Sequence, residues 1–200
     1  PLNGTVGPEG DVVTFTGMTS DVDVSPDWLN VTWSSDKDGQ LGAVTPDSSG
    51  NIIFSYAGLT VNTHTISLQV TDEVGATCTA LTTFTVGTPP SVSIDSPSNG
   101  DVISEGDIVT FVATVSDAQD QSDEVALDWV MNGSSFSIQG ATSSGTATFS
   151  EAALPFGIYN LVVTATDSDG LTDSDQINFT VNGIPSTPVV SIDPAGPVTG

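Results

Sequence analysis

Apolar and polar residues alternate with a period of two along most of this chain, which is the pattern of half-buried β-strands. In the clearest case Tyr159, Leu161, Val163 and Ala165 share one face of a single segment. Other segments are expected to present Val13 and Phe15; Val109, Phe111, Ala113 and Val115; Leu29, Val31 and Trp33; Val125, Leu127 and Trp129; His64, Ile66, Leu68 and Val70; Thr82, Phe84 and Val86; and Ile177, Phe179 and Val181. No stretch has a sustained helical period. The sequence therefore predicts an all-β protein in which these sets fill the space between two sheets.

The sequence also repeats itself, with a period close to the length of one immunoglobulin-like domain. Pro1–Phe15 (PLNGTVGPEGDVVTF) resembles Pro97–Phe111 (PSNGDVISEGDIVTF), and the offset persists without a gap to Trp33 and Trp129 (129 − 33 = 96). Over these 33 positions 14 residues are identical, whereas unrelated sequences would match at about two or three. After a one-residue change in a loop, the repeat continues to the last strand of each copy.

These repeats predict tandem immunoglobulin-like antiparallel β-sandwich domains with Greek-key connections. Residues 1–88 form the first repeat, which lacks its first strand, and residues 89–186 form the second. Residues 187–200 hold the first strand of a third copy, because Val190-Ser191-Ile192-Asp193 repeats Val92-Ser93-Ile94-Asp95 (193 − 95 = 98). Two interpretations stay open. We favour an excerpt from a longer array, and the alternative is that the spare strand joins a sheet edge of another molecule.

Aromatic residues mark two features of such sandwiches. Trp33 and Trp129 take the position of the tryptophan that is buried on the third strand, and their alternation with Leu and Val favours a core role over sugar binding. Leu154–Tyr159 (LPFGIY) has the pattern of a tyrosine corner. His64 occupies the place of this tyrosine in the first repeat, so we expect a structural role for it rather than catalysis or metal binding.

The charge of the chain excludes several partners. The sequence holds 25 Asp and Glu, one basic residue (Lys37) and a formal net charge of −24. Nucleic acids are bound by neutralising phosphates with Lys and Arg, so this chain would repel them, and it would repel anionic membranes for the same reason. It also repels itself, and Ca²⁺ is the natural compensating cation because it prefers oxygen ligands. Cys78 aligns with Asp173 and indicates no required thiol.

The acidic residues fall in loops that an antiparallel sandwich brings to its two ends. The joint between the repeats is expected to gather Glu9, Asp117, Asp120, Asp167 and Asp169. The matching end of the first repeat holds Asp21, Asp23, Asp72 and Glu73, the outer end of the second holds Glu105, and Asp95 lies either at the joint or at the far end. Unpaired like charges repel, and a Ca²⁺ ion with six to eight oxygen ligands would convert this repulsion into a clamp. The alternative is that these acids are solvated loop residues or Asx turns.

The order of the motifs resembles PKD-type and cadherin-like immunoglobulin repeats of bacterial and archaeal surface and secreted proteins. The shared motifs are the PEGD and SEGD turns, an SD loop, the tryptophan strand, L-x-x-G-x-Y and TDSDG, and they cover both repeats. The WDFGDG-like segment usual in PKD domains is missing, since SSDKDG follows Trp33 and VMNGSS follows Trp129. The resemblance implies an extracellular location and Ca²⁺ at the joints, as in cadherin-like arrays.

The leading interpretation is a Ca²⁺-rigidified structural or adhesive segment of a surface stalk, an S-layer-like coat or a filament. Its partners would be neighbouring repeats of the same protein, with self-assembly by strand donation as a further option. The alternative is an accessory carbohydrate- or protein-binding module of a secreted hydrolase, with Trp28, Tyr56 and Phe156 as candidate contacts. An enzyme is disfavoured because the sequence has no Ser-His-Asp set, phosphate loop or His/Cys metal cluster. Sequons that could accept glycans occur at Asn3, Asn30, Asn132 and Asn178.

Overall fold

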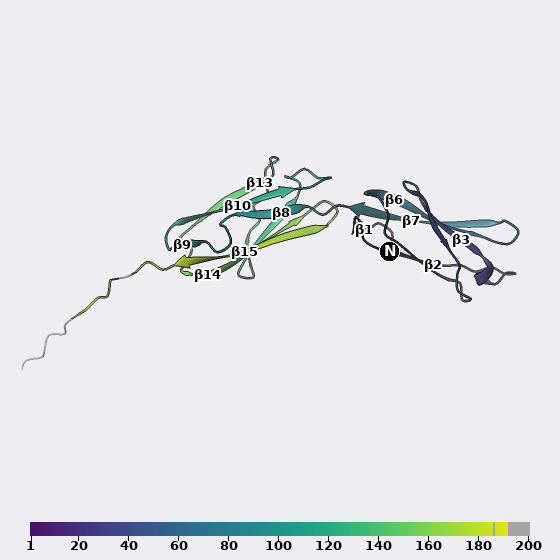
Figure 1. Ribbon diagram of the computed structural model, residues 1–200, viewed down its shortest axis with the longest axis horizontal. Coiled ribbons are helices and arrows are strands. Elements are labelled where there is room, and N and C mark those ends of the chain that lie inside the picture. Colours follow the sequence, from purple (N-terminus) through teal and green to yellow (C-terminus); the bar gives the residue numbers. More distant parts are fainter. Residues whose placement is uncertain (186, 192–200) are drawn as a thin grey trace, which may run out of the picture.

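The computed structural model describes residues 1–185 and 187–191. Strands β1–β7 and β8–β15 form separate sets of sheets that follow one another along the chain, and we call them domain 1 and domain 2 (Figure 1). The segment predicted to begin a third copy carries no strand over residues 187–191, and residues 192–200 lie outside the described part of the chain.

Domain 2 is a sandwich of a three-stranded and a five-stranded sheet. Its strand orders are β13-β10-β8 and β12-β11-β14-β15-β9. The strands are β8 (Ser91–Ser96), β9 (Val102–Ser104), β10 (Ile108–Ser116), β11 (Ala126–Met131), β12 (Ser134–Ser137), β13 (Thr146–Ala152), β14 (Gly157–Thr166) and β15 (Thr172–Asn182). All pairings are antiparallel except that of β9 with β15. The chain therefore contributes its first strand to one sheet and then crosses to the edge of the other.

Domain 1 repeats this plan with one strand fewer. Its five-stranded sheet has the order β1-β7-β6-β3-β4, and its second sheet contains only β2 and β5. The elements are β1 (Thr5–Pro8), β2 (Val13–Met18), the 3-10 helix η1 (Pro26–Trp28), β3 (Asn30–Ser35), β4 (Gly39–Val44), β5 (Asn51–Tyr56), β6 (Asn62–Thr71) and β7 (Thr77–Gly87). Within the described residues, no strand of domain 1 takes the place that β8 takes in domain 2.

Each sandwich has its own hydrophobic core, and the two cores differ in size. In domain 2, eighteen buried side chains form the core, including those of Phe111 and Trp129. In domain 1 the corresponding cluster contains nine, including Phe15 and Trp33. Most residues that the alternation predicts to be internal are buried in both domains, but Val13, Val70, Thr82 and Tyr159 are only partly buried.

The two repeats build the same corner with different side chains. The Tyr159 hydroxyl donates a 2.6 Å hydrogen bond to the carbonyl of Pro155, four residues earlier. His64 is fully buried, and its Nε2 lies 2.7 Å from the carbonyl of Thr60, again four residues earlier. A carbonyl can only accept, so Nε2 donates this bond, and Nδ1 lies 2.8 Å from the Ser35 hydroxyl. His64 therefore has the structural role predicted for it.

Candidate functional site

The joint between the domains is a packed contact. Gly87 at the end of β7 and Pro90 before β8 are both buried. The Gln119 side-chain amide donates a 3.0 Å hydrogen bond to the Thr88 hydroxyl, which connects the loop after β10 to the linker. A Cβ atom on Gly87 would lie only 3.1 Å from Asp169 Oδ2. The absence of a side chain at this position thus allows the loop after β14 to approach the linker.

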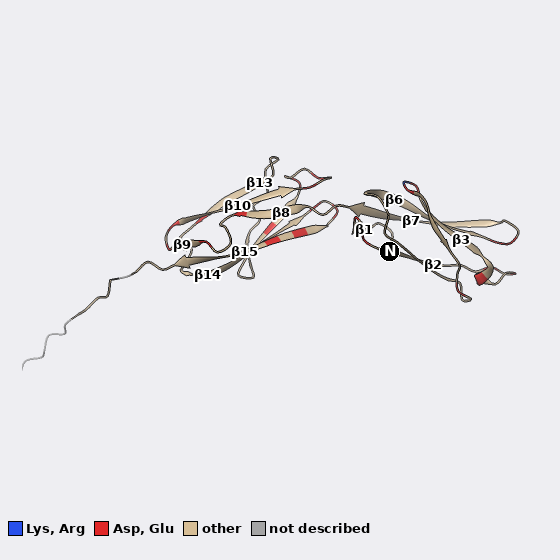
Figure 2. Cartoon of the chain, in the orientation of Figure 1, with Lys and Arg blue, Asp and Glu red and all other residues tan. Residues whose placement is uncertain are grey.

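Four carboxylates lie in the two loops of domain 2 that face this joint. Asp120 joins the loops, because its two oxygens accept from the backbone N–H and the hydroxyl of Ser168 at 2.8 and 2.9 Å. Asp117 Oδ1 accepts two 2.7 Å hydrogen bonds from backbone N–H groups of its own loop. Asp167 Oδ1 accepts one, also at 2.7 Å, from Leu171. We call Asp117, Asp120, Asp167 and Asp169 the joint cluster, and Figure 2 shows acidic residues in the loops near the joint.

The joint cluster carries negative charge, and none of its carboxylates forms an ion pair within the part of the chain that the structure describes. The pKa of Asp169 is raised by burial of its carboxyl and by the negative charges of Asp167, Asp120 and Asp117. Asp117 Oδ2 is buried and has no hydrogen-bond partner among the residues that the structure describes. Unpaired buried polar atoms are rare, so both observations fit a place where a cation would be stabilised.

The donor chemistry of this cluster suits a hard cation. All candidate ligands are oxygens, which Ca²⁺ prefers, and three of the four carboxylates are already held by loop hydrogen bonds. These bonds also agree with the Asx-turn interpretation, since they use one oxygen of Asp117 and one of Asp167. Over residues 1–185 and 187–191, no three His, Cys, Asp or Glu side chains converge closely enough to form a ready metal site. Ion binding would therefore require the loops to close further.

Glu9, which is predicted for the joint, and Glu105, which is predicted for the outer end of domain 2, occupy equivalent positions in their domains. The Glu9 N–H donates to the carbonyl of Gly87 at 2.9 Å, and the Glu105 N–H donates to that of Asn182 at 2.8 Å. Glu9 therefore lies at the joint, with its side chain exposed. Glu105 lies at the other end of domain 2, where its Oε2 accepts from the N–H of Ile184 at 3.4 Å.

Asp95 does not belong to the joint cluster. It lies near the end of β8, about 13 Å along the strand from the linker at about 3.3 Å per residue, and its Oδ2 accepts a 2.6 Å hydrogen bond from the Thr114 hydroxyl. The structure therefore places Asp95 away from the joint.

The matching end of domain 1 brings its four predicted acids near one another. A hydrogen bond between Asp21 and Asp23 lowers the pKa of Asp21 and raises that of Asp23. The nearby charge of Glu73 raises the pKa of Asp23 further. Asp72 Oδ1 accepts from two N–H groups of its own loop at 3.0 and 2.7 Å.

Only half of the joint cluster is repeated at that end of domain 1. Asp21 and Asp72 correspond to Asp117 and Asp167, but Val24 and Val74 stand where Asp120 and Asp169 would be expected. The two additional carboxylates, Asp120 and Asp169, thus occur in domain 2 but not in domain 1. Sequence reasoning missed Gly87, Thr88, Gln119 and Ser168, because contacts made by single residues at a strand end or in a loop carry no periodic signal.

The exposed aromatic residues do not form one binding surface. Trp28 lies in η1 of domain 1 and Phe156 lies before β14 of domain 2, and they are 75% and 71% exposed. Tyr56 is only partly exposed and stacks on Phe54 with ring centroids 6.1 Å apart. The asparagines of the four sequons are all exposed. In the described part of the chain, no helix has the length and apolar character to cross a membrane.

Comparisons with known proteins agree with this architecture. A family model for a bacterial Ig domain matches residues 90–163. The chain is similar to the fibronectin(III)-like modules of CbhA from Clostridium thermocellum, with 17% identity, 92% of both chains covered and a TM-score of 0.50. It is also similar to a three-Ig fragment of titin, an E-to-A variant, with 10% identity and a TM-score of 0.52 over 90% of this chain and 63% of that one. No curated protein is significantly similar in sequence.

At these identities the solved structures show the fold alone, and they confirm the predicted fold class of an Ig-like β-sandwich. The PKD-type and cadherin-like types remain predictions. Bacterial Ig-like domains are common on surface proteins, and families of this fold are generally non-catalytic. The chain thus consists of two Ig-like β-sandwich domains, of which the second is similar to a bacterial Ig domain.

Proposed function

We propose that this chain is a structural segment of an extracellular or cell-surface protein, such as a stalk, an S-layer-like coat or a filament, whose joint is held rigid by Ca²⁺. The observation that carries the proposal is the joint cluster, in which the unpartnered Asp117 Oδ2 and the repelled Asp169 carboxyl lie beside a buried linker. A structural role needs a fixed angle between domains, and a cation at this position would fix it.

The chemistry of the proposed clamp follows from the two loops that it would join. Asp117 and Asp120 come from the loop after β10, and Asp167 and Asp169 come from the loop after β14. An ion bound between these loops would draw Asp169 toward the others and hold the segment that packs on Gly87. Glu9 could add a ligand from domain 1, since its backbone is bonded to Gly87.

Adding Ca²⁺ should raise the melting temperature of domain 2. At a free Ca²⁺ concentration about ten times Kd, binding to one site adds about 1.4 kcal/mol to the free energy of unfolding. For a domain of this size that corresponds to a rise of roughly 6–10 °C. Calorimetry with Ca²⁺ and with a chelator measures the shift, and small-angle scattering measures whether the distribution of interdomain distances narrows.

Two variants with the same change of charge test whether the joint cluster is responsible. Asp117→Asn should remove most of the Ca²⁺ response. Asp128→Asn should keep it, because Asp128 is an exposed residue in the middle of β11. An equal Ca²⁺ response in both variants, or none in the unmodified chain, would refute the clamp.

Asp169→Asn should stabilise domain 2 at neutral pH when Ca²⁺ is absent. The folded-state pKa of Asp169 lies above its ordinary value of 3.8, so ionisation of this group opposes folding. Removing the charge should raise the melting temperature by about 2–4 °C, the effect of relieving up to about 0.5 kcal/mol of repulsion. As the pH falls from 7 through the raised pKa, Asp169 becomes neutral and the advantage of the variant should vanish. Melting curves measured between pH 7 and 4 test the direction of this stability difference. An Asp169→Asn variant that is less stable than the unmodified chain at pH 7 would contradict the prediction.

A further inference from the structure

The turn between β11 and β12 consists of two residues, Asn132 and Gly133. Met131 pairs with Ser134 across it, and the two turn residues have positive φ angles of 50° and 78°. Asn-Gly is the preferred sequence for tight hairpin turns of this conformation. The turn lies at the end of an edge hairpin of the five-stranded sheet, and both of its residues are exposed.

The Asn132 side chain uses only its carbonyl oxygen within the fold. Oδ1 accepts a 2.8 Å hydrogen bond from the backbone N–H of Asn160 on β14, whereas Nδ2 has no hydrogen-bond partner in the described part of the chain. Asp36 occupies the equivalent position in domain 1 (132 − 36 = 96), and its Oδ1 accepts a 2.6 Å bond from the N–H of Thr65. The structural role thus needs an oxygen but no amide, which leaves the Asn132 amide available for other chemistry.

The hydroxyl two residues after Asn132 is equally available. Ser134 is exposed, and its hydroxyl forms no hydrogen bond with the residues that the structure describes. A Cβ atom added to Gly133, between them, would meet no atom within 4 Å, so the turn is open to an approaching molecule. The three residues have the Asn-x-Ser/Thr pattern that oligosaccharyltransferases recognise.

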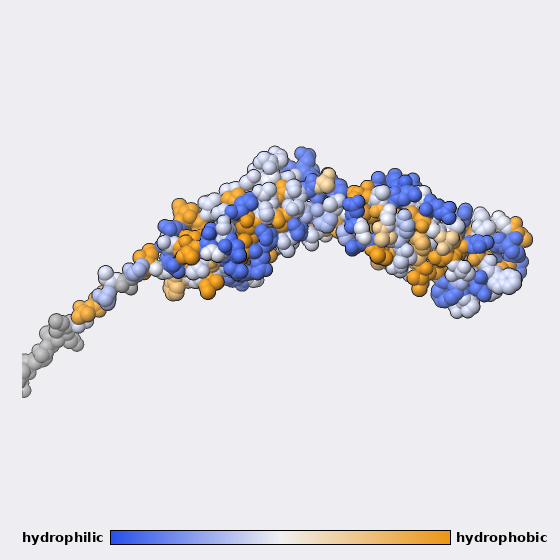
Figure 3. All heavy atoms as spheres, in the orientation of Figure 1, coloured by the Kyte–Doolittle hydropathy of each residue, from blue (hydrophilic) through white to orange (hydrophobic). Residues whose placement is uncertain are grey.

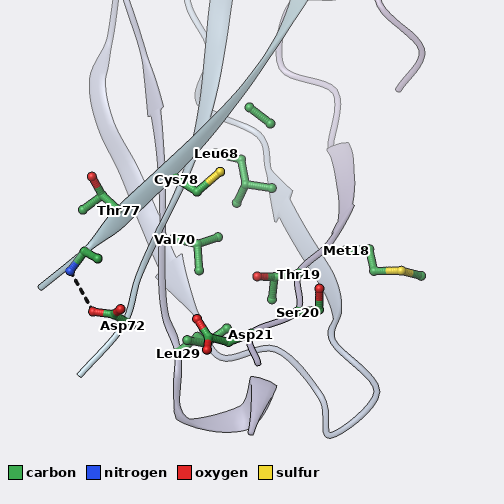
Figure 4. A pocket seen from close by; sticks show the side chains of 12 residues that line it. Met18, Thr19, Ser20, Asp21, Leu29, Leu68, Val70, Asp72, Thr77 and Cys78 are labelled. Atoms are coloured by element: carbon green, nitrogen blue, oxygen red, sulfur yellow. Dashed lines mark hydrogen bonds between the residues drawn. The ribbon is translucent and has the colours of Figure 1, made fainter. Parts of the chain in front are cut away.

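Two of the other sequons lie in strands, with their middle residue buried. Val31 in the Asn30 sequon and Phe179 in the Asn178 sequon are each 1% exposed. Leu29, which precedes Asn30, lines the groove between the end of β2 and the strands β6 and β7 (Figure 4). A transferase has to draw the whole tripeptide into its active site. In the folded chain, modification at either site would therefore require a core side chain to leave its place.

The sequon at Asn3 lies in a turn, but its polar groups are already used. Asn3 Oδ1 accepts hydrogen bonds from the N–H and the hydroxyl of Thr83 at 2.8 and 3.0 Å. The Thr5 hydroxyl donates a 2.9 Å bond to the carbonyl of Leu2. A transferase has to detach this hydroxyl before it can bind it, whereas Ser134 needs no such step.

We propose that Asn132 is an N-glycosylation site at which an oligosaccharide is transferred from a lipid diphosphate to the folded chain. The bond that forms joins Nδ2 to the anomeric carbon of the first sugar, the bond between that carbon and the diphosphate oxygen breaks, and Nδ2 loses one proton. Oδ1 keeps its hydrogen bond from Asn160, so the product is compatible with the fold. Such transfer takes place outside the cytoplasm, so the modification rests on the extracellular location proposed above.

The glycan would lie on the side of domain 2 and away from the joint. The six residues of β11 separate Asn132 from the loop after β10 by about 20 Å at about 3.3 Å per residue. Figure 3 shows hydrophobic residues interspersed among hydrophilic ones on the surface of domain 2. Ile158, two residues before Asn160 on β14, is 76% exposed, and a bulky polar glycan at Asn132 would shield this region from other molecules. Glycosylation and Ca²⁺ binding concern separate sites, so either can fail without the other.

Glycosylation of the full folded chain in vitro tests the proposal. The chain is incubated with an oligosaccharyltransferase that modifies folded proteins and with a lipid-linked oligosaccharide, and mass spectrometry of glycopeptides gives the rate at each sequon. Each rate is divided by that of a synthetic peptide with the same sequon, because Ser and Thr sequons differ intrinsically. This ratio should be at least about tenfold higher at Asn132 than at Asn30 and Asn178, since exposing a buried Val or Phe costs more than a tenfold preference.

The peptides also show that the enzyme is active in the same mixture. If the Asn132 peptide is modified but Asn132 of the folded chain is not, the proposal is wrong. A ratio at Asn132 no higher than those at the two strand sequons would overturn it as well. Neither result depends on Ca²⁺ or on where the protein resides, so the proposed function is tested separately.

Two serine variants test whether the enzyme reads this sequon. Ser134→Ala removes the recognised hydroxyl but keeps Asn132 and its hydrogen bond, and it should abolish modification at this site. Ser135→Ala makes the same change at the next residue, which is also exposed but lies outside the sequon, and it should leave the modification unchanged. Equal loss or equal survival of the glycan in the two variants would contradict the assignment.

Discussion

Heating this chain should unfold domain 1 well before domain 2. Domain 2 buries Val92 and Ile94 of β8, whereas domain 1 has no such strand within the described residues. Burying two side chains of this size contributes about 3–6 kcal/mol to stability. A difference of this magnitude corresponds to roughly 15 °C or more between the two transitions. Calorimetry measures the separation, and hydrogen exchange resolved by peptide assigns the lower transition to residues 1–88.

Supplying the missing strand within the same chain should close most of that gap. Adding the sequence of β8, SVSIDS, directly before Pro1 places the strand as it lies before Pro97 in domain 2. The lower transition should rise while the upper one stays where it is. The matched control, SDSDDS, has the same length but charged residues at the inward positions and should give no rise. A single cooperative transition in the unmodified chain, or equal effects of both additions, would contradict the account of domain 1 as an incomplete sandwich.

The fold could be predicted from the sequence because the alternation within each strand and the repeat between the two domains identify the same internal positions. The alternation at Phe111 and Ala113 identifies an internal face, and both residues are fully buried. The short strands β1 and β9 escaped prediction for a physical reason. They contain four and three residues and pair in parallel with strands that are distant in sequence. Segments this short show no recognisable alternation of apolar and polar residues.

The candidate site could be predicted only to the level of loops. An antiparallel sandwich necessarily brings the loops after β10 and β14 to one end, and the joint cluster lies there. The direction of each carboxylate is decided by local hydrogen bonds, such as those from Ser168 to Asp120, which the sequence does not reveal. Glu9 illustrates the limit, since its backbone lies at the joint while its side chain points into solvent.

The two core tryptophans should respond differently to loss of their indole nitrogen, although their rings are equally internal. Trp129 is fully buried, and its Nε1–H donates a 2.9 Å hydrogen bond to the carbonyl of Gln139. Trp33 is 3% exposed and stacks on Phe54, but its Nε1 has no partner in the described part of the chain. The same substitution therefore removes a satisfied donor in one domain and an unsatisfied donor in the other.

Trp129→Ala should destabilise domain 2 by about 3–5 kcal/mol, the usual cost of emptying a large core site. Trp129→Phe should still cost about 1 kcal/mol more than Trp33→Phe, because it removes the hydrogen bond to the Gln139 carbonyl, whereas the substitution at Trp33 removes an N–H without a partner in the described part of the chain. Urea unfolding followed separately for each domain measures both differences. A Trp33→Phe variant as damaged as Trp129→Phe would mean that ring volume alone, and not the indole hydrogen bond, sets the stability of these cores.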